Sequence, residues 1–136
     1  PIGVRGEVTT VALPWPADVP EGGRHGFLHS DTTGFTNAVD EAVATLLPEL
    51  ESSTSTVVVG HEELMYLPLC IAEGLAHAGI PTTFHHHALT RIVRNVDGYP
   101  LRRVLTFTAP EHDPGTPRFV YNLLDQTARP TFRGSC

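Results

Sequence analysis

Lysine is absent from this chain of 136 residues, so all nine of its basic side chains are arginine. Cysteine is scarce as well, and Cys70 and Cys136 form neither a disulfide framework nor a metal-ligand spacing. No apolar run approaches the roughly 18 residues that cross a bilayer, and the first residues show no basic region followed by an apolar one. We therefore expect a cytoplasmic protein without a membrane partner.

Charge is divided unevenly along the chain. Residues 1–90 hold 11 acidic side chains and two arginines, whereas residues 91–136 hold four acidic side chains and seven arginines. The net charge of −6 at pH 7 argues against a nucleic-acid partner, because sequence-independent binding needs a basic face. The arginines suit contacts with phosphate or carboxylate groups. Alternatively, several are solvated charges on strands and loops, namely Arg102, Arg103, Arg118, Arg129 and Arg133.

Apolar residues recur with helical spacing in two segments. Over residues 35–50 they fall three and four positions apart, which predicts a helix. The second segment starts at Leu64 and ends where Gly79 stops the helix and Pro81 prevents its continuation. Two helices are therefore expected.

Strands are expected around these helices. Short apolar runs at residues 57–59 and 82–88 predict two of them. The alternating run at residues 8–13 predicts an initial strand, which precedes a loop rich in proline and glycine. Residues 104–107 and 119–121 predict two further strands at the edge of the sheet, in the form of a hairpin.

The order helix, strand, helix, strand with short links is typical of a parallel α/β layer. We therefore predict a single α/β domain over residues 1–136, of which residues 1–23 are partly linker-like. The expected architecture is a Rossmann-like, three-layer, mostly parallel sheet with added C-terminal edge strands.

The junction after the strand at residues 57–59 is the most informative part of the chain. The apolar run ends at Gly60, a histidine and two carboxylates follow, and the second helix then begins. In open α/β sheets, ligands bind beyond the carboxyl ends of the strands. The residues predicted to form a site here are Gly60, His61, Glu62, Glu63 and Tyr66.

These residues suit more than one role. His61, Glu62 and Glu63 are candidates for acid–base catalysis, because apolar neighbours favour the protonated form of a carboxylic acid. The same groups can instead hydrogen-bond to ribose hydroxyls. A structural role is a further alternative, since carboxylates at the start of a helix interact favourably with its positive end.

A second group of ligand-binding candidates precedes the first predicted helix and consists of Asp31, Thr32, Thr33 and Gly34. Hydroxyls, a carboxylate and a glycine at a helix N-terminus present hydrogen-bond donors to a phosphate. The order Asp-Thr-Thr-Gly is similar to the loop with which phosphoribosyltransferases hold phosphoribosyl pyrophosphate. The same composition also serves as an ordinary helix cap, so both interpretations stay open.

Histidines form a third group. Alternate residues of a strand face the same way, so His85 and His87 present nitrogens on one side, and His61 follows the neighbouring strand. Together they would form part of a site for a divalent metal, with Glu62 as the base of a metal-dependent hydrolase. No His-Glu-x-x-His or Cys-x-x-Cys spacing supports this site, and packed or hydrogen-bonding histidines are the alternative.

Thr90 and Arg91 form a fourth group. A hydroxyl next to a guanidinium at the end of a strand is a good receptor for an anion. The alternative is a solvated arginine before the turn marked by Asp97-Gly98.

Several short motifs together support a family resemblance. The most specific is Val59-Gly60-His61-Glu62-Glu63-Leu64-Met65-Tyr66-Leu67-Pro68. The shorter ones are Gly23-Arg24-His25-Gly26, Ala72-Glu73, Thr90-Arg91, Asp97-Gly98-Tyr99-Pro100 and Tyr121-Asn122. With these motifs the chain resembles the TRSP domain, a bacterial module found C-terminal to a phosphoribosyltransferase domain in tellurium-resistance-type biosynthetic operons. Where the family motif reads Thr-Arg-Ser-Pro, this chain continues after Arg91 with Ile92 and Val93.

The resemblance implies a companion module in the synthesis of a nucleoside-like or phosphoribosylated metabolite. The preferred hypothesis is an accessory or substrate-binding domain that holds a phosphorylated or ribosylated small molecule. Its protein partner would be a phosphoribosyltransferase domain in the same or a companion chain, and the domain would then act as part of that enzyme. The metal-dependent hydrolase and a non-catalytic interaction domain are the alternatives.

Overall fold

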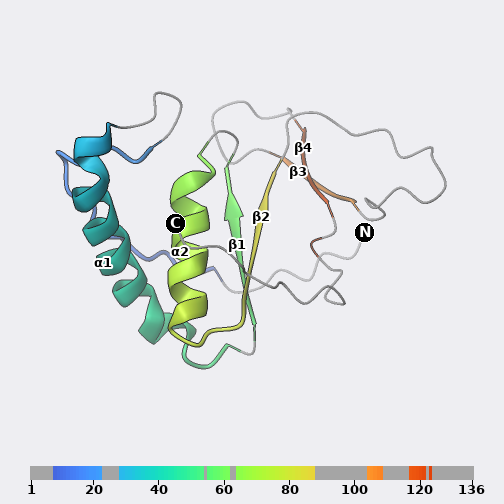
Figure 1. Cartoon of the computed structure of the whole chain (residues 1–136). Coiled ribbons are helices and arrows are strands. Elements are labelled where there is room, and N and C mark those ends of the chain that lie inside the picture. The colour runs from blue at the N-terminus through green and yellow to red at the C-terminus, as the bar shows by residue number, and fades with distance from the viewer. Residues whose placement is uncertain are drawn as a thin grey trace.

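Helices α1 and α2 and four strands make up the regular structure of the described residues (Figure 1). The computed structural model describes residues 8–22, 28–53, 55–61, 64–87, 104–108, 117–121 and 123. The elements are the short 3₁₀ turn η1 (His29–Asp31), α1 (Thr32–Leu50), β1 (Thr56–Gly60), α2 (Tyr66–His77), β2 (Thr82–His86), β3 (Val104–Thr108) and β4 (Pro117–Tyr121). Within this part of the chain, no helix combines the length and the apolar character that crossing a bilayer requires.

Strands β1 and β2 pair in parallel, as the order of elements predicts. Their register runs from Thr56 opposite Thr82 to Gly60 opposite His86. The helix between them, α2, packs on both strands. This βαβ unit confirms the predicted parallel layer and brings the C-terminal ends of both strands to one edge.

Helix α2 ends as the sequence predicts. Gly79 adopts a positive φ of 92°, which glycine reaches without the strain that a β-carbon would add. The N–H of Ile80 donates to the carbonyl of Leu75 at 3.0 Å, and the N–H of Gly79 donates to Ala76 at 3.1 Å. These hydrogen bonds use carbonyls that have no partner inside the helix, and they turn the chain back toward β2.

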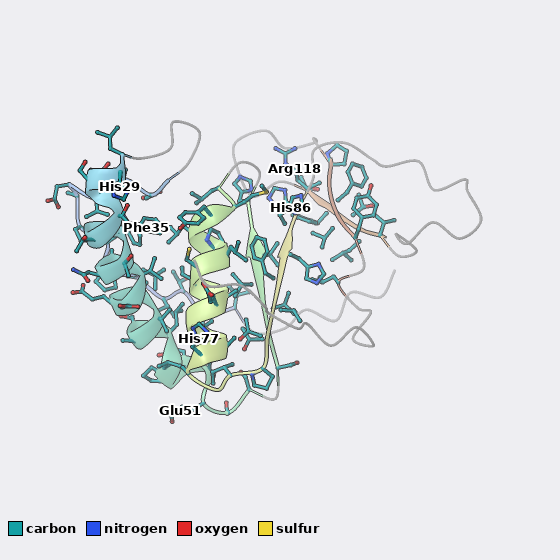
Figure 2. All side chains as sticks on the ribbon, in the orientation of Figure 1. His29, Phe35, Glu51, His77, His86 and Arg118 are labelled. Carbon is teal, nitrogen blue, oxygen red and sulfur yellow. The ribbon has the colours of Figure 1, made fainter. Side chains whose placement is uncertain are left out.

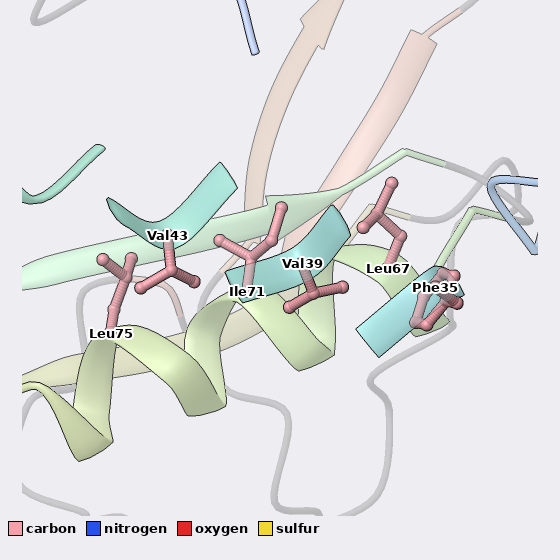
Figure 3. Packing of buried hydrophobic residues seen from close by; sticks show 6 residues of the cluster. All are labelled: Phe35, Val39, Val43, Leu67, Ile71 and Leu75. Atoms are coloured by element: carbon pink, nitrogen blue, oxygen red, sulfur yellow. The ribbon is translucent and has the colours of Figure 1, made fainter. Parts of the chain in front are cut away.

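The core lies between the two helices (Figure 3). Buried residues of α1 and α2 form one cluster, and Val58 of β1 packs against it. The buried members are Phe35, Val39, Val43, Leu67, Ile71 and Leu75. A β-carbon added to Gly74 would lie 2.7 Å from a methyl carbon of Val43, so the close approach of the helices depends on this glycine.

Strands β3 and β4 form a separate antiparallel pair, with Val104 opposite Tyr121 and Thr108 opposite Pro117. The prediction of two strands that pair as a hairpin agrees with this register. The prediction that they extend the parallel sheet is wrong for the described residues, where the strands form two sheets of two strands each. Side-chain contacts connect the two sheets instead: the ring of Phe107 in β3 lies edge-on to His87, directly after β2.

The mixed α/β class is confirmed, but a three-layer Rossmann fold is not. Helix α1 packs on α2, and the described part of the chain holds no further helix for the opposite face of the β1–β2 pair. On that face Val57 and Val59 are 38% and 43% exposed.

The initial strand expected at residues 8–13 is not formed. Val8 is 90% exposed there, and no strand of the described part pairs with this segment. Farther along, Trp15 attaches the segment to the helical layer through an edge-on contact with Phe35, with ring centroids 5.6 Å apart. The indole N–H of Trp15 donates to the carbonyl of Val19 at 2.8 Å.

Candidate functional site

The C-terminal ends of β1 and β2 and the N-terminal ends of α1 and α2 lie at the same end of the domain (Figure 1). Figure 2 shows His29, Phe35 and His86 at this end, whereas Glu51 and His77 lie at the opposite end. We call this end the strand-end site, and its described members are Asp31, Thr32, Thr33, Gly34, Gly60, His61, Tyr66 and His87. Parallel α/β layers bind ligands at this position.

An aromatic stack joins two of the predicted groups. The ring of Tyr66, at the start of α2, stacks on Phe35 with centroids 5.3 Å apart and planes 17° apart. Phe35 follows Gly34 directly, so the stack places residues 31–34 beside the start of α2. Tyr66 is 40% exposed and Met65 is 44% exposed, so this part of the site is open to solvent. The sequence alone did not show that these two groups are neighbours.

Local hydrogen bonds already use the polar groups of residues 28–32. The carboxylate of Asp31 accepts the N–H of Leu28 at 2.9 Å and the hydroxyl of Ser30 at 3.2 Å. The hydroxyl of Thr32 donates to the carbonyl of His29 at 2.8 Å. These bonds support a capping role for Asp31 and Thr32 in η1. They leave α1 without a side-chain cap, and α2 lacks one as well.

Both glycines of the predicted site lie in close contacts. A β-carbon on Gly60 would lie 3.1 Å from the carbonyl oxygen of Leu64 and 3.4 Å from the ring of Phe84. A β-carbon on Gly34 would lie 3.3 Å from a methyl carbon of Val19. The sequence predicted a ligand-binding role for them, and the structure shows a packing role in addition.

His61 and His87 are in direct contact at the ends of β1 and β2. Nδ1 of His61 faces Nε2 of His87, and the ring centroids are 4.4 Å apart. The backbone explains the pair, because the N–H of His87 donates to the carbonyl of Gly60 at 3.2 Å and extends the strand pairing by one step. His87 is 5% exposed, whereas His61 is partly buried.

His85 pairs with Val59 in β1 and lies two residues before His87 along the chain. Residues two apart along a strand lie on the same face with their Cα atoms about 7 Å apart, so spacing alone does not separate His85 from His87. Within the described residues, no group of three or more histidine, cysteine, aspartate or glutamate side chains is arranged to hold a metal ion. The structure therefore brings together two of the three predicted histidines.

The other predicted site residues lie outside the described part of the chain. They are Glu62, Glu63, Thr90 and Arg91. Their roles stay predictions. The described residues on either side of the first two are in contact, because the N–H of Leu64 donates to the carbonyl of His61 at 2.9 Å.

Arg118 is a buried charge that the sequence interpretation placed among solvated arginines. It is 7% exposed, so that interpretation is wrong for this residue. Arg118 of β4 lies opposite Phe107 of β3, and Phe107 contacts His87 at a centroid distance of 5.6 Å. The one signal in the sequence was the position of this arginine directly before the apolar pair Phe119 and Val120.

Comparison with protein families agrees with the motif resemblance. Residues 21–132 match the family model described as "TRSP domain C terminus to PRTase_2". No curated protein and no solved structure matches the chain in the corresponding comparisons. The match spans the βαβ unit, the strand-end site and the β3–β4 pair, so it covers every element described above.

Proposed function

The chain belongs to the TRSP domain family, and from this membership we propose that it is the accessory or substrate-binding domain of a phosphoribosyltransferase-type system. The family description places the domain C-terminal to a phosphoribosyltransferase-type domain, and that domain is the proposed partner, in the same or a companion chain. The proposed ligand is a phosphorylated or ribosylated small molecule used in making a nucleoside-like metabolite.

The observation that carries this proposal is the convergence at the strand-end site. Two parallel strands end there, and two helices without side-chain caps begin there. The first N–H groups of a helix have no partner inside the helix, and together with the helix dipole they favour a negatively charged group. A phosphate is the anion that such a site binds most often in parallel α/β layers.

Hydroxyl and aromatic groups around the same edge suit a ribosyl compound. Thr33 and Tyr66 are exposed there, and the imidazole of His61 is accessible in part. Thr90 and Arg91 are the proposed partners of the phosphate, and Glu62 and Glu63 are the proposed partners of ribose hydroxyls or the proposed acid–base groups.

A thermal-shift screen tests the proposal, because a ligand that binds the native state raises its apparent stability. The compounds are phosphoribosyl pyrophosphate, ribose 5-phosphate, nucleotides and ribose, each with and without Mg²⁺. We expect the melting temperature to rise with at least one phosphoribosyl compound and to stay unchanged with ribose alone at the same concentration. If no compound shifts the melting temperature, a non-catalytic interaction domain becomes the better description.

The contact between His61 and His87 favours a second candidate, a metal-dependent hydrolase. Zinc sites in enzymes generally use three protein ligands and keep one position for water. The pair would therefore need a further ligand, for which Glu62 and Glu63 are the nearest in sequence. Elemental analysis of the purified protein tests this candidate: if zinc, manganese and iron are absent and adding them restores no hydrolytic activity, it is excluded.

A further inference from the structure

We propose that the turn at residues 15–19 positions the strand-end site, and that Trp15 acts there as a positioning residue through Phe35. This inference rests on the proposed function and deepens it, because it names a segment on which binding of the phosphoribosyl compound depends. The turn lies before residues 21–132, which match the family model, and in a stretch that the sequence predicts to be partly linker-like. The inference therefore extends the functional unit beyond the matched residues.

The 15–19 turn is closed by its own hydrogen bonds. The N–H of Val19 donates to the carbonyl of Pro16 at 3.1 Å, and the indole N–H of Trp15 donates to the carbonyl of Val19 at 2.8 Å. Pro16 restricts the backbone further, because its ring fixes φ. These features hold Trp15 and Val19 together, and both side chains pack against the core cluster.

Trp15 and Val19 contact neighbouring residues at the start of α1. Trp15 lies edge-on to Phe35, with ring centroids 5.6 Å apart and planes 73° apart. A β-carbon on Gly34 would lie 3.3 Å from a methyl carbon of Val19, so little space separates the turn from this backbone. Gly34 lies in the first turn of α1, whose N–H groups the proposed function assigns to the anion. The 15–19 turn therefore packs directly on the proposed phosphate-binding backbone.

Phe35 connects Trp15 to the second helix. Its ring contacts Trp15 and also stacks on Tyr66, at a centroid distance of 5.3 Å. Phe35 is 3% exposed, and a closely packed ring that touches two others cannot move without changing one of those contacts. Trp15 thus limits the positions that the ring of Tyr66 adopts. Binding groups that are already held in place lose less conformational entropy when a ligand binds.

A purely structural role is the alternative, because burying an indole also stabilises a domain. A structural role lowers the fraction of molecules that are folded, whereas a positioning role lowers the affinity of the molecules that remain folded. A destabilising substitution far from the site separates these two roles. Val43 is suitable, since Figure 3 shows it well away from Phe35 in the buried cluster, and eight helical residues span about 12 Å.

Calorimetric titration of the full 136-residue chain with ribose 5-phosphate and with phosphoribosyl pyrophosphate tests the inference. The variants are Trp15→Ala, Trp15→Phe and Val19→Ala, and Val43→Ala is the matched control for lost stability. Circular dichroism identifies a temperature at which every titrated variant is folded.

We expect Trp15→Ala to bind roughly 5- to 10-fold more weakly, because the loosened groups must then be ordered when the ligand binds. Trp15→Phe should restore most of the affinity, since it keeps a ring beside Phe35 although it loses the indole N–H. Val19→Ala should bind about 2- to 3-fold more weakly, because it removes the methyl groups beside Gly34. Val43→Ala should lower the melting temperature and leave the affinity unchanged.

The inference is overturned if folded Trp15→Ala binds both compounds with unchanged affinity, and the proposed function would then stand without the turn. Equal losses of affinity in Trp15→Ala and Val43→Ala would overturn it as well, since general loosening of the domain would then explain both. Should Trp15→Ala not fold, Val19→Ala decides the matter, and unchanged affinity of this variant contradicts the proposal.

If the unmodified chain binds neither compound, the proposed function fails, and NMR of the unliganded chain tests the turn separately. The ring resonances of Tyr66, assigned with Tyr66→Phe, should move in Trp15→Ala and stay in place in Val43→Ala. Unmoved resonances in Trp15→Ala would show that the turn does not position this ring, and the inference would be overturned on that ground alone.

Discussion

The ring of Tyr66 stacks on the ring of Phe35, with centroids 5.3 Å apart and planes 17° apart. Tyr66 begins α2 and Phe35 lies in the first turns of α1, so this single contact joins the N-terminal ends of both helices. Trp15 contacts the same ring of Phe35 edge-on, with centroids 5.6 Å apart. The geometry of the strand-end site therefore depends on Phe35, whose side chain is buried and only 3% exposed.

Replacing the ring of Phe35 should lower the stability of the domain. We expect Phe35→Leu to lower the free energy of unfolding by about 1–2 kcal/mol, because it removes buried apolar atoms and two ring contacts. Urea unfolding followed by the fluorescence of Trp15, the single tryptophan, measures the change. As a control, His29→Gln alters an exposed residue at the same end and should leave the unfolding midpoint in place.

The contact between Gly74 and Val43 predicts that Gly74→Ala destabilises the unmodified chain but stabilises a Val43→Ala variant. In the unmodified chain, Gly74→Ala should cost about 0.5–2 kcal/mol, since overpacking against Val43 exceeds the gain in helix propensity. In a Val43→Ala background the obstructing methyl groups are gone, so the same substitution should stabilise by about 0.5–1 kcal/mol. Urea unfolding of the four proteins in this cycle gives the coupling directly. Equal effects in both backgrounds would contradict the packing seen here.

Gly60→Ala should be more damaging than Gly79→Ala. The added carbon at Gly60 meets a backbone carbonyl at 3.1 Å, which cannot rotate away, and an aromatic ring at 3.4 Å. At Gly79 nothing lies within 4 Å, so the cost there is the strain of a positive φ, about 1 kcal/mol. Thermal unfolding of both variants compares them. A smaller loss for Gly60→Ala would contradict the close contact between Gly60 and the carbonyl of Leu64.

Arg91→Ala should weaken binding of phosphoribosyl compounds roughly tenfold without lowering the melting temperature of the unliganded chain. Arg91 is a proposed anion partner rather than a packing residue, and its family motif begins at Thr90. Arg133→Ala serves as the charge-matched control, because it removes the same charge from a position assigned to the solvated group. Titration calorimetry with ribose 5-phosphate measures both variants. Unchanged affinity for Arg91→Ala would remove this residue from the site.

Local patterns in the sequence determined the βαβ unit and the position of the strand-end site. The apolar spacing around Val39 and Val43, the run of valines before Gly60, and the stop at Gly79 each act within a few residues of the chain. Helix and strand formation respond to such short-range patterns. The placement of His61 at the end of a strand followed from them as well.

Only the tertiary structure decided how distant segments meet. It paired β3 with β4 instead of adding them to the parallel sheet, and it buried Arg118. It placed His61 in contact with His87, whereas His85 pairs with Val59, two residues before the end of the strand pairing. These outcomes depend on contacts between residues far apart in sequence. Forming such contacts costs the conformational entropy of closing long loops, and the free energy gained by burying side chains and by pairing strands in register offsets that cost. The sequence by itself therefore determined the local elements and the edge where they end, whereas packing between elements determined which side chains share that edge.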